Sequence, residues 1–217
     1  MLEVAGELAD ALAPVLEEGQ VVRIDCRGDW QEVVSPESIE TSDKTVATVL
    51  HDLPLALQAD RVLLLDAGRV AAYGGSYGGF MSLACLVNYP DRFRCGVDNV
   101  GIANFVTFLR DTSDYRRGNR RLEYGDERKP EVREFLERIS PANQAERIKA
   151  PLLIVQGRND PRVPVTEAER MRDAVRAKGG RVWYVMAKDE GHGFVKKTNA
   201  DYQFLATALF LREFLLR

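Results

Sequence analysis

The chain has 217 residues, of which 45% are hydrophobic and 29% are charged, and its formal net charge is −3. This length suits one domain, or at most two, able to bury roughly 70% of the unfolded surface. The slightly acidic balance gives no reason to expect a nucleic acid or an anionic membrane as a partner. No apolar run approaches the roughly 20 residues that a membrane-spanning helix needs.

The N-terminal sequence and the cysteines indicate a cytoplasmic protein. Residues 1–7 lack the basic region of a secretory signal and carry acids where such a signal would be apolar. Cys26, Cys85 and Cys95 are an odd number, at a spacing that fits neither a zinc site nor a disulfide framework. We therefore expect reduced thiols, and no metal site or cofactor.

The first 68 residues predict short elements but contain no recognisable catalytic motif. A helix is expected over 2–18, a loop over 27–44, a short helical piece over 54–59, strands over 21–26, 45–50 and 61–65, and a turn at 66–68.

From residue 69 onward, strands alternate with helices. Strands are predicted at 70–73, 95–100, 152–156 and 181–187, and helices at 80–87, from 105, at 131–139, at 165–178 and at 199–216. Arginines cluster between residues 110 and 130, a pattern that favours a solvated helical or loop surface over a binding patch. The alternation predicts an α/β fold with a mostly parallel sheet and helices on both faces.

A serine lies at the junction of the first strand and the first helix of this alternation. Residues 74–79 read Gly-Gly-Ser-Tyr-Gly-Gly, which contains the pattern G-x-S-x-G with Ser76 at its centre. Such a strand–turn–helix elbow strains the serine backbone, and a Cβ at Gly74 or Gly78 would clash. The alternative is a glycine-rich turn with an incidental serine. The strand before it and the helix after it favour a nucleophile.

A serine hydroxyl needs a base, and the base needs a group that fixes its tautomer. Two loops at strand ends offer them: 157–164 contains Asp160, and 189–194 contains His192. The order Ser76, Asp160, His192, with gaps of 160 − 76 = 84 and 192 − 160 = 32 residues, is that of the α/β-hydrolase triad. Asp160 alone could be a turn former and His192 alone a solvated loop residue, but the three together predict a catalytic triad.

These motifs resemble the catalytic domain of the prolyl oligopeptidase family. They read Gly-Gly-Ser-Tyr-Gly-Gly-Phe, Gln-Gly-Arg-Asn-Asp-Pro-Arg-Val-Pro and Asp-Glu-Gly-His-Gly-Phe, and the likeness runs from about residue 69 to the C-terminus. The chain is most similar to the bacterial acylaminoacyl peptidase and dipeptidyl aminopeptidase branch. The resemblance implies an α/β-hydrolase fold and a serine-type peptidase that hydrolyses peptide or N-acyl amino acid bonds through an acyl-enzyme.

The resemblance also implies a role for each site residue. Ser76 would be the nucleophile, His192 the general base and then acid, and Asp160 the carboxylate that orients it. Tyr77 would supply a backbone N–H to the oxyanion hole. Arg162 matches the position that the family uses to bind a substrate carbonyl, and a guanidinium suits that task. The alternative for Arg162 is a surface salt bridge.

The upstream third departs from the family pattern. No His-Gly-Gly sequence precedes Ser76, and 68 residues cannot contain the family's β-propeller. Residues 46–53 and 59–70 resemble instead the segment after the switch histidine of ABC transporter ATPases, by chance or through a gene fusion or frameshift. Without a G-x-x-x-x-G-K-[ST] loop, nucleotide hydrolysis is excluded.

We therefore expect an atypical N-terminal segment over 1–68, which replaces the first strands or reflects truncation, and a catalytic core over 69–217. Two alternatives to the peptidase remain: a carboxylesterase on the same fold, and a catalytically silent truncated hydrolase that acts as an interaction module. The sequence leaves the oligomeric state open.

Overall fold

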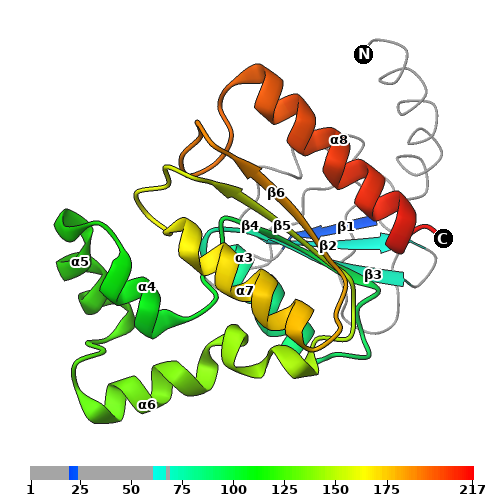
Figure 1. The fold of residues 1–217 in the computed structure, drawn as a ribbon. Coiled ribbons are helices and arrows are strands. Elements are labelled where there is room, and N and C mark those ends of the chain that lie inside the picture. The colour runs from blue at the N-terminus through cyan, green and yellow to red at the C-terminus, as the bar shows by residue number, and fades with distance from the viewer. Residues whose placement is uncertain (1–19, 24–60, 67–68) are drawn as a thin grey trace.

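The computed structural model describes residues 20–23, 61–66 and 69–217, which contain a six-stranded sheet with helices packed against it (Figure 1). The strands are β1 (Gln20–Arg23), β2 (Arg61–Asp66), β3 (Arg69–Gly75), β4 (Cys95–Asn99), β5 (Leu152–Gly157) and β6 (Val182–Ala187). Their order in the sheet is β1-β2-β3-β4-β5-β6. β1 pairs antiparallel with β2 and β2 with β3, whereas β3 to β6 run parallel.

β2 supports the strand that leads into the serine turn. It pairs with β3 from Arg61 opposite Gly74 to Asp66 opposite Arg69. Asp66 therefore ends a strand, whereas the sequence predicted it as the first residue of a turn. The sheet contains residues from both sides of position 68, and the division of the chain at that position stays a prediction.

In the sequence, the described helices lie between consecutive parallel strands, from β3 to β6, or after β6. They are α3 (Tyr77–Asn88), α4 (Phe105–Asp111), α5 (Asp114–Tyr124), α6 (Pro130–Ile139), the 3₁₀ segment η1 (Pro141–Arg147), α7 (Val165–Ala177) and α8 (Lys197–Phe214). No helix of the described part is long and apolar enough to cross a membrane.

Helices cover both faces of the sheet, as the alternation predicts (Figure 1). Successive side chains of a strand point to opposite faces. Leu153 of β5 accordingly packs in one cluster with Phe210 of α8, whereas Leu152 packs in another with Leu83 of α3 and Met171 of α7. Because β5 is covered on both sides, its sequence begins as an unbroken apolar run.

Between β4 and β5 the chain forms more helices than the sequence predicts. In place of a helix from residue 105 and another at 131–139, it forms α4, α5, α6 and η1. The Asn104 side chain accepts the Thr107 N–H at 3.1 Å and so caps the start of α4. α4 and α6 pack through apolar side chains, but α5 has no buried residue. With no apolar stripe, α5 gives a weak sequence signal.

Several sequence predictions fall outside the described residues. They are the helix at 2–18, the last three residues of the strand at 21–26, the loop at 27–44, the strand at 45–50, the helical piece at 54–59 and the last two residues of the turn at 66–68.

Candidate active site

Ser76 occupies the sharp turn between β3 and α3, with φ 57° and ψ −118°. A positive φ is unfavourable for a residue with a side chain and persists only where its surroundings impose it. The Ser76 N–H donates to the carbonyl of Asn99, at the end of β4, over 2.9 Å. A Cβ on Gly74 would lie 2.1 Å from the carbonyl oxygen of Gly78. The close approach expected at Gly74 is therefore present, and it keeps the turn tight.

The structure brings Ser76, His192 and Asp160 together in one chain of hydrogen bonds. His192 Nε2 lies 2.9 Å from Ser76 Oγ, and His192 Nδ1 lies 2.7 Å from Asp160 Oδ2. An ionised carboxylate accepts and cannot donate, so Nδ1 carries the proton and Nε2 accepts from the serine hydroxyl. This is the tautomer that a general base for Ser76 requires.

The Asp160 carboxylate is shielded from water and fully hydrogen-bonded. Its side chain is 0% exposed. Oδ1 accepts the backbone N–H groups of Arg162 at 2.8 Å and Val163 at 3.0 Å. Oδ2 accepts from His192 and also from the side-chain amide of Gln156, at 3.2 Å. These contacts compensate for the burial of the charge and define the direction of the carboxylate.

Backbone contacts join the loop of Asp160 to the loop of His192. Arg158 N donates to the Ala187 carbonyl and Asn159 N to the Glu190 carbonyl, each over 2.9 Å. A Cβ on Gly157 would lie 2.1 Å from the Gly191 carbonyl oxygen. Glycine at position 157 therefore allows the two loops to pack backbone against backbone, and this packing fixes the distance between the base and its carboxylate.

Glu190 anchors the loop that carries His192. Its carboxylate accepts the N–H groups of Val195 at 3.1 Å and Lys196 at 2.8 Å, and the side-chain amide of Asn199 at 2.9 Å. The hydrogen bond from Asn199 is the main cause that lowers the pKa of Glu190. Glu190 is therefore ionised at neutral pH and ties both sides of the loop together.

Tyr77 and Arg162 flank this arrangement. Tyr77 is the first residue of α3, and its ring stacks on that of Tyr124 with centroids 6.1 Å apart. The Arg162 side chain is exposed, and among the described residues no carboxylate pairs with its guanidinium. The structure therefore places the Tyr77 backbone beside Ser76 and leaves the Arg162 cation facing solvent. Their predicted roles stay proposals.

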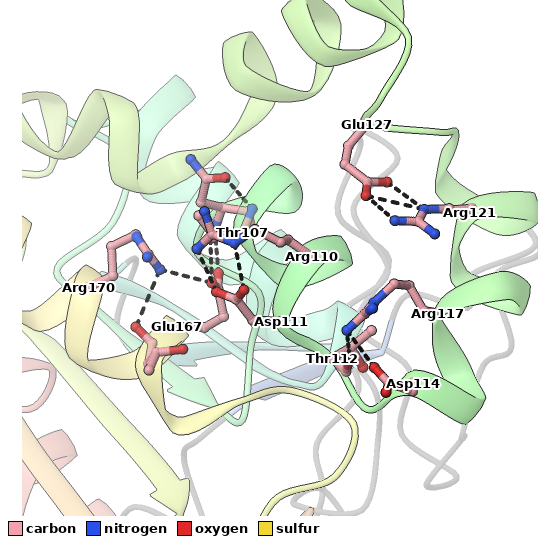
Figure 2. Close-up of polar contacts among 12 residues, drawn as sticks. Thr107, Arg110, Asp111, Thr112, Asp114, Arg117, Arg121, Glu127, Glu167 and Arg170 are labelled. Carbon is pink, nitrogen blue, oxygen red and sulfur yellow. Dashed lines mark hydrogen bonds and ion pairs between the residues drawn. The ribbon is translucent and has the colours of Figure 1, made fainter.

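The arginine-rich segment forms ion pairs (Figure 2), and through Thr112 it is hydrogen-bonded to the loop that carries Asp160. Arg121 of α5 donates two N–H groups to Glu127, and Arg117 pairs with Asp114 at 2.8 Å. Arg117 also donates to the carbonyl of Thr112 at 3.2 Å. The Thr112 hydroxyl in turn donates to the Arg162 carbonyl at 2.9 Å. These polar contacts thus connect α5 to the segment that follows Asp160, in addition to the Tyr124 ring, which packs against the apolar cluster that contains Val163.

Sequence reasoning missed three polar residues of this region: Asp98, Gln156 and Glu190. All three are buried. The available signal was a polar residue within or beside a short apolar strand, which is expensive to bury unless it has partners. Within the described part of the chain, no group of three or more His, Cys, Asp or Glu side chains could hold a metal ion.

A strained serine on an elbow, with a histidine and a buried aspartate on neighbouring strand ends, is typical of serine hydrolases with the α/β-hydrolase fold. The chain belongs more narrowly to the prolyl oligopeptidase family, whose sequence model matches residues 55–216. The match begins 69 − 55 = 14 residues upstream of the region that carries the motifs.

Two relatives illustrate the likeness in sequence. The chain is 43% identical over 136 residues to dipeptidyl aminopeptidase BIII of Pseudoxanthomonas mexicana, an alignment that covers 60% of this chain and 19% of that protein. It is 35% identical over 154 residues to dipeptidyl peptidase family member 6 of Caenorhabditis elegans, with 69% and 21% covered. The chain therefore spans about a fifth of the length of these relatives.

Solved structures show the same fold. The acylaminoacyl peptidase of Pyrococcus horikoshii matches with a TM-score of 0.63 and 25% identity, over 69% of this chain and 25% of that one. A puromycin-hydrolyzing peptidase of Mycobacterium tuberculosis matches with a TM-score of 0.63 and 31% identity, over 69% of this chain and 22% of that one. The predicted α/β-hydrolase fold and the predicted family are both confirmed.

Proposed function

We propose that this chain is a serine-type peptidase that hydrolyses peptide or N-acyl amino acid bonds through an acyl-enzyme on Ser76. The observation that carries the proposal is the hydrogen-bonded chain Ser76–His192–Asp160, with distances of 2.9 and 2.7 Å. Family membership supports it, as do relatives whose names describe peptidases.

In the first half of the reaction, Ser76 Oγ attacks the scissile carbonyl carbon while its proton passes to His192 Nε2. Asp160 accepts the Nδ1–H and stabilises the imidazolium that forms. The tetrahedral intermediate collapses when His192 gives the proton to the leaving amine, and the acyl group stays on Ser76. A water molecule, deprotonated by the same nitrogen, then attacks the acyl carbon. The bond to Ser76 Oγ breaks, His192 returns the proton to Oγ, and the acid leaves.

Two further residues would bind the substrate. The N–H of Tyr77, at the first position of α3, would donate to the oxyanion, because the N-terminus of a helix favours negative charge. Arg162 is two residues beyond Asp160, and its backbone N–H bonds that carboxylate at 2.8 Å. An exposed guanidinium so close to the site would orient a peptide carbonyl of the substrate.

A fluorophosphonate probe, which esterifies an activated serine, tests the proposal on the full 217-residue chain. We expect labelling of the native chain at Ser76, and none of the Ser76→Ala variant or of the chain unfolded in urea. The absence of labelling in a chain shown by circular dichroism to be folded would refute the enzyme proposal. That result would favour a silent interaction module.

The same triad cleaves esters and amides, so the substrate class needs its own measurement. Matched p-nitroanilide and p-nitrophenyl ester substrates with one N-acyl amino acid separate the two activities. A peptidase cleaves both, and Arg162→Gln should raise KM more than it lowers kcat on the peptide-like substrates. Cleavage of the ester alone would indicate the carboxylesterase.

We also infer a cytoplasmic location. Cys95 is a buried free thiol in the described structure. Free thiols are typical of a reducing compartment.

A further inference from the structure

Gln156 is a fully buried polar residue at the end of β5, directly below the Asp160 loop. Its exposure is 0%. The four residues before it in β5 are Leu, Leu, Ile and Val, all buried as well. A side-chain amide in such surroundings is unfavourable unless its hydrogen bonds are made. Packing alone therefore does not explain why an amide occupies this position.

The Gln156 amide nitrogen lies within hydrogen-bond distance of three acceptors of the loop that carries Asp160. Nε2 is 3.1 Å from the Gly157 carbonyl oxygen, 3.1 Å from that of Val163 and 3.2 Å from Asp160 Oδ2. A flipped amide would direct its oxygen at three oxygen atoms, so the NH₂ group must face the loop. The loop from Gly157 to Val163 thus places three acceptors around this one NH₂ group.

The other end of the amide makes no compensating contact. Gln156 Oε1 is buried, and no described residue donates a hydrogen bond to it. Leaving such an acceptor unpaired is costly, whereas an apolar side chain of the same shape would have no such cost. The amide at position 156 therefore makes the fold less stable than an apolar side chain would. In return it makes the hydrogen bonds to the Asp160 loop.

Gln156 and His192 share one oxygen of Asp160. Oδ2 accepts from both, while Oδ1 accepts from the backbone N–H groups of Arg162 and Val163. Without the Gln156 donor, Oδ2 would have a single partner and the carboxylate could rotate away from the histidine. The amide also places partial positive charge beside the carboxylate and so moderates the negative field that His192 experiences.

We propose that Gln156 is a positioning residue: its amide fixes Asp160 Oδ2 toward His192 Nδ1 and tunes the protonation of that histidine. This inference rests on the proposed peptidase function, because it assigns Gln156 a task in the same triad. Gln156 touches neither Ser76 nor the reacting bond, and it acts only through Asp160.

Two substitutions in the full chain test the inference. Gln156→Met keeps the length of the side chain and removes the donor. Gln156→Glu keeps a donor only while the new carboxyl is protonated, which its buried, acceptor-lined position favours. Gln144→Met is the matched control, because the Gln144 amide, in η1, donates to the Arg138 carbonyl of α6 and not to the triad. Urea unfolding confirms that each variant is folded.

The first readout is the second-order rate of fluorophosphonate labelling. A hydrogen bond to a charged group is worth about tenfold to a hundredfold in an equilibrium, so we expect Gln156→Met to slow labelling by a similar factor. Gln156→Glu should label faster than Gln156→Met at pH 6 and lose this advantage at pH 8. Gln144→Met should label like the parent chain. Rates for Gln156→Met within twofold of the parent would overturn the inference.

The second readout does not need activity. The chain has two histidines, and His51→Gln identifies the His192 imidazole signals in an NMR titration. Loss of the amide makes the field at His192 more negative if Asp160 keeps its place and less negative if the carboxylate rotates away, so the titration midpoint of His192 should differ between Gln156→Met and the parent. An unchanged midpoint overturns the inference. A parent chain that does not label refutes the proposed function, while the titration still decides the role of Gln156.

Discussion

Asp98 is a carboxyl group enclosed under the serine elbow, and its removal should change how the stability of the chain depends on pH. It lies on β4 and is 1% exposed. A Cβ on Gly79 would lie 2.4 Å from its Oδ1, and one on Gly101 would lie 2.0 Å away. Two glycines thus make the space that the carboxyl fills. No described residue donates a hydrogen bond to Oδ1.

Burial raises the pKa of Asp98 from 3.8 to about 7. The N–H of Gly101 opposes this rise, and the charge of Glu167 adds to it. Between about pH 4 and pH 7 the folded chain keeps the proton on Asp98 and the unfolded chain releases it. The folded state then binds more protons, so the free energy of unfolding falls as the pH rises through this window and is level above it. The slope is about 1.4 kcal/mol per pH unit, so the loss between pH 5 and pH 7 approaches about 2.7 kcal/mol.

Asp98→Asn has nearly the same size and no ionisation in this range. The assay is urea unfolding of the parent and the variant at pH 5 and pH 8, extrapolated to water. All other groups titrate in both chains, so their effects cancel in the difference. We expect the stability of Asp98→Asn relative to the parent to rise by about 2–3 kcal/mol from pH 5 to pH 8. Asp201→Asn, at an exposed position of α8, controls for the loss of a carboxylate in general.

A stability difference between Asp98→Asn and the parent that is equal at the two pH values, or that shrinks from pH 5 to pH 8, would refute the raised pKa of Asp98. Either result would mean that Asp98 is already ionised in the folded chain at pH 5. The enclosure by Gly79 and Gly101 would then not exclude water from the carboxylate.

Two further predictions concern the loops of the candidate triad. Gly157→Ala places a Cβ 2.1 Å from the Gly191 carbonyl oxygen, so it should lower the free energy of unfolding by about 1–3 kcal/mol and abolish fluorophosphonate labelling. Gly118→Ala, whose Cβ meets nothing within 4 Å, should instead stabilise α5 by up to about 1 kcal/mol and leave labelling unchanged; equal behaviour of the two variants would contradict the argument. Glu190→Gln should slow labelling about tenfold, because Val195 and Lys196 lose a charged acceptor, and labelling within twofold of the parent would argue against this anchor. Since the pKa of Glu190 is lowered, the anchor is complete at neutral pH and is lost as the pH falls through the lowered value.

The members of the candidate triad could be found from the sequence because each stands in a local pattern with a mechanical cause. Ser76 needs glycines around it. The loops of Asp160 and His192 each follow a strand that can be predicted from its apolar composition. In the described part of the chain, those strands lie where they were expected. The chain order of the three residues, which is that of the α/β-hydrolase triad, then indicated that they meet in the fold. Hydrophobic periodicity predicts single elements and carries no such information.

The buried polar residues around the candidate triad, such as Gln156 and Asp98, could not be predicted, since their roles depend on contacts across the fold. Gln156 follows four apolar residues and gives no sign that its amide meets an aspartate four positions later. Asp98 sits in the ordinary strand sequence Cys-Gly-Val-Asp-Asn. α5 has no buried residue: ion pairs such as Arg121 with Glu127 and the ring of its last residue, Tyr124, attach it, and these contacts leave no periodic apolar pattern in the sequence.

The order of the strands in the sheet has a consequence for the time at which a catalytic site can appear. Each described strand pairs with the strand before it in the chain, so the sheet can grow at one edge as the polypeptide leaves the ribosome. Ser76 is in place once β3, α3 and β4 have folded. His192 is 116 residues further on and follows the outermost strand, β6. During synthesis Ser76 is therefore without His192 until β6 has been added, so the proposed activity would begin only after that strand has joined the sheet.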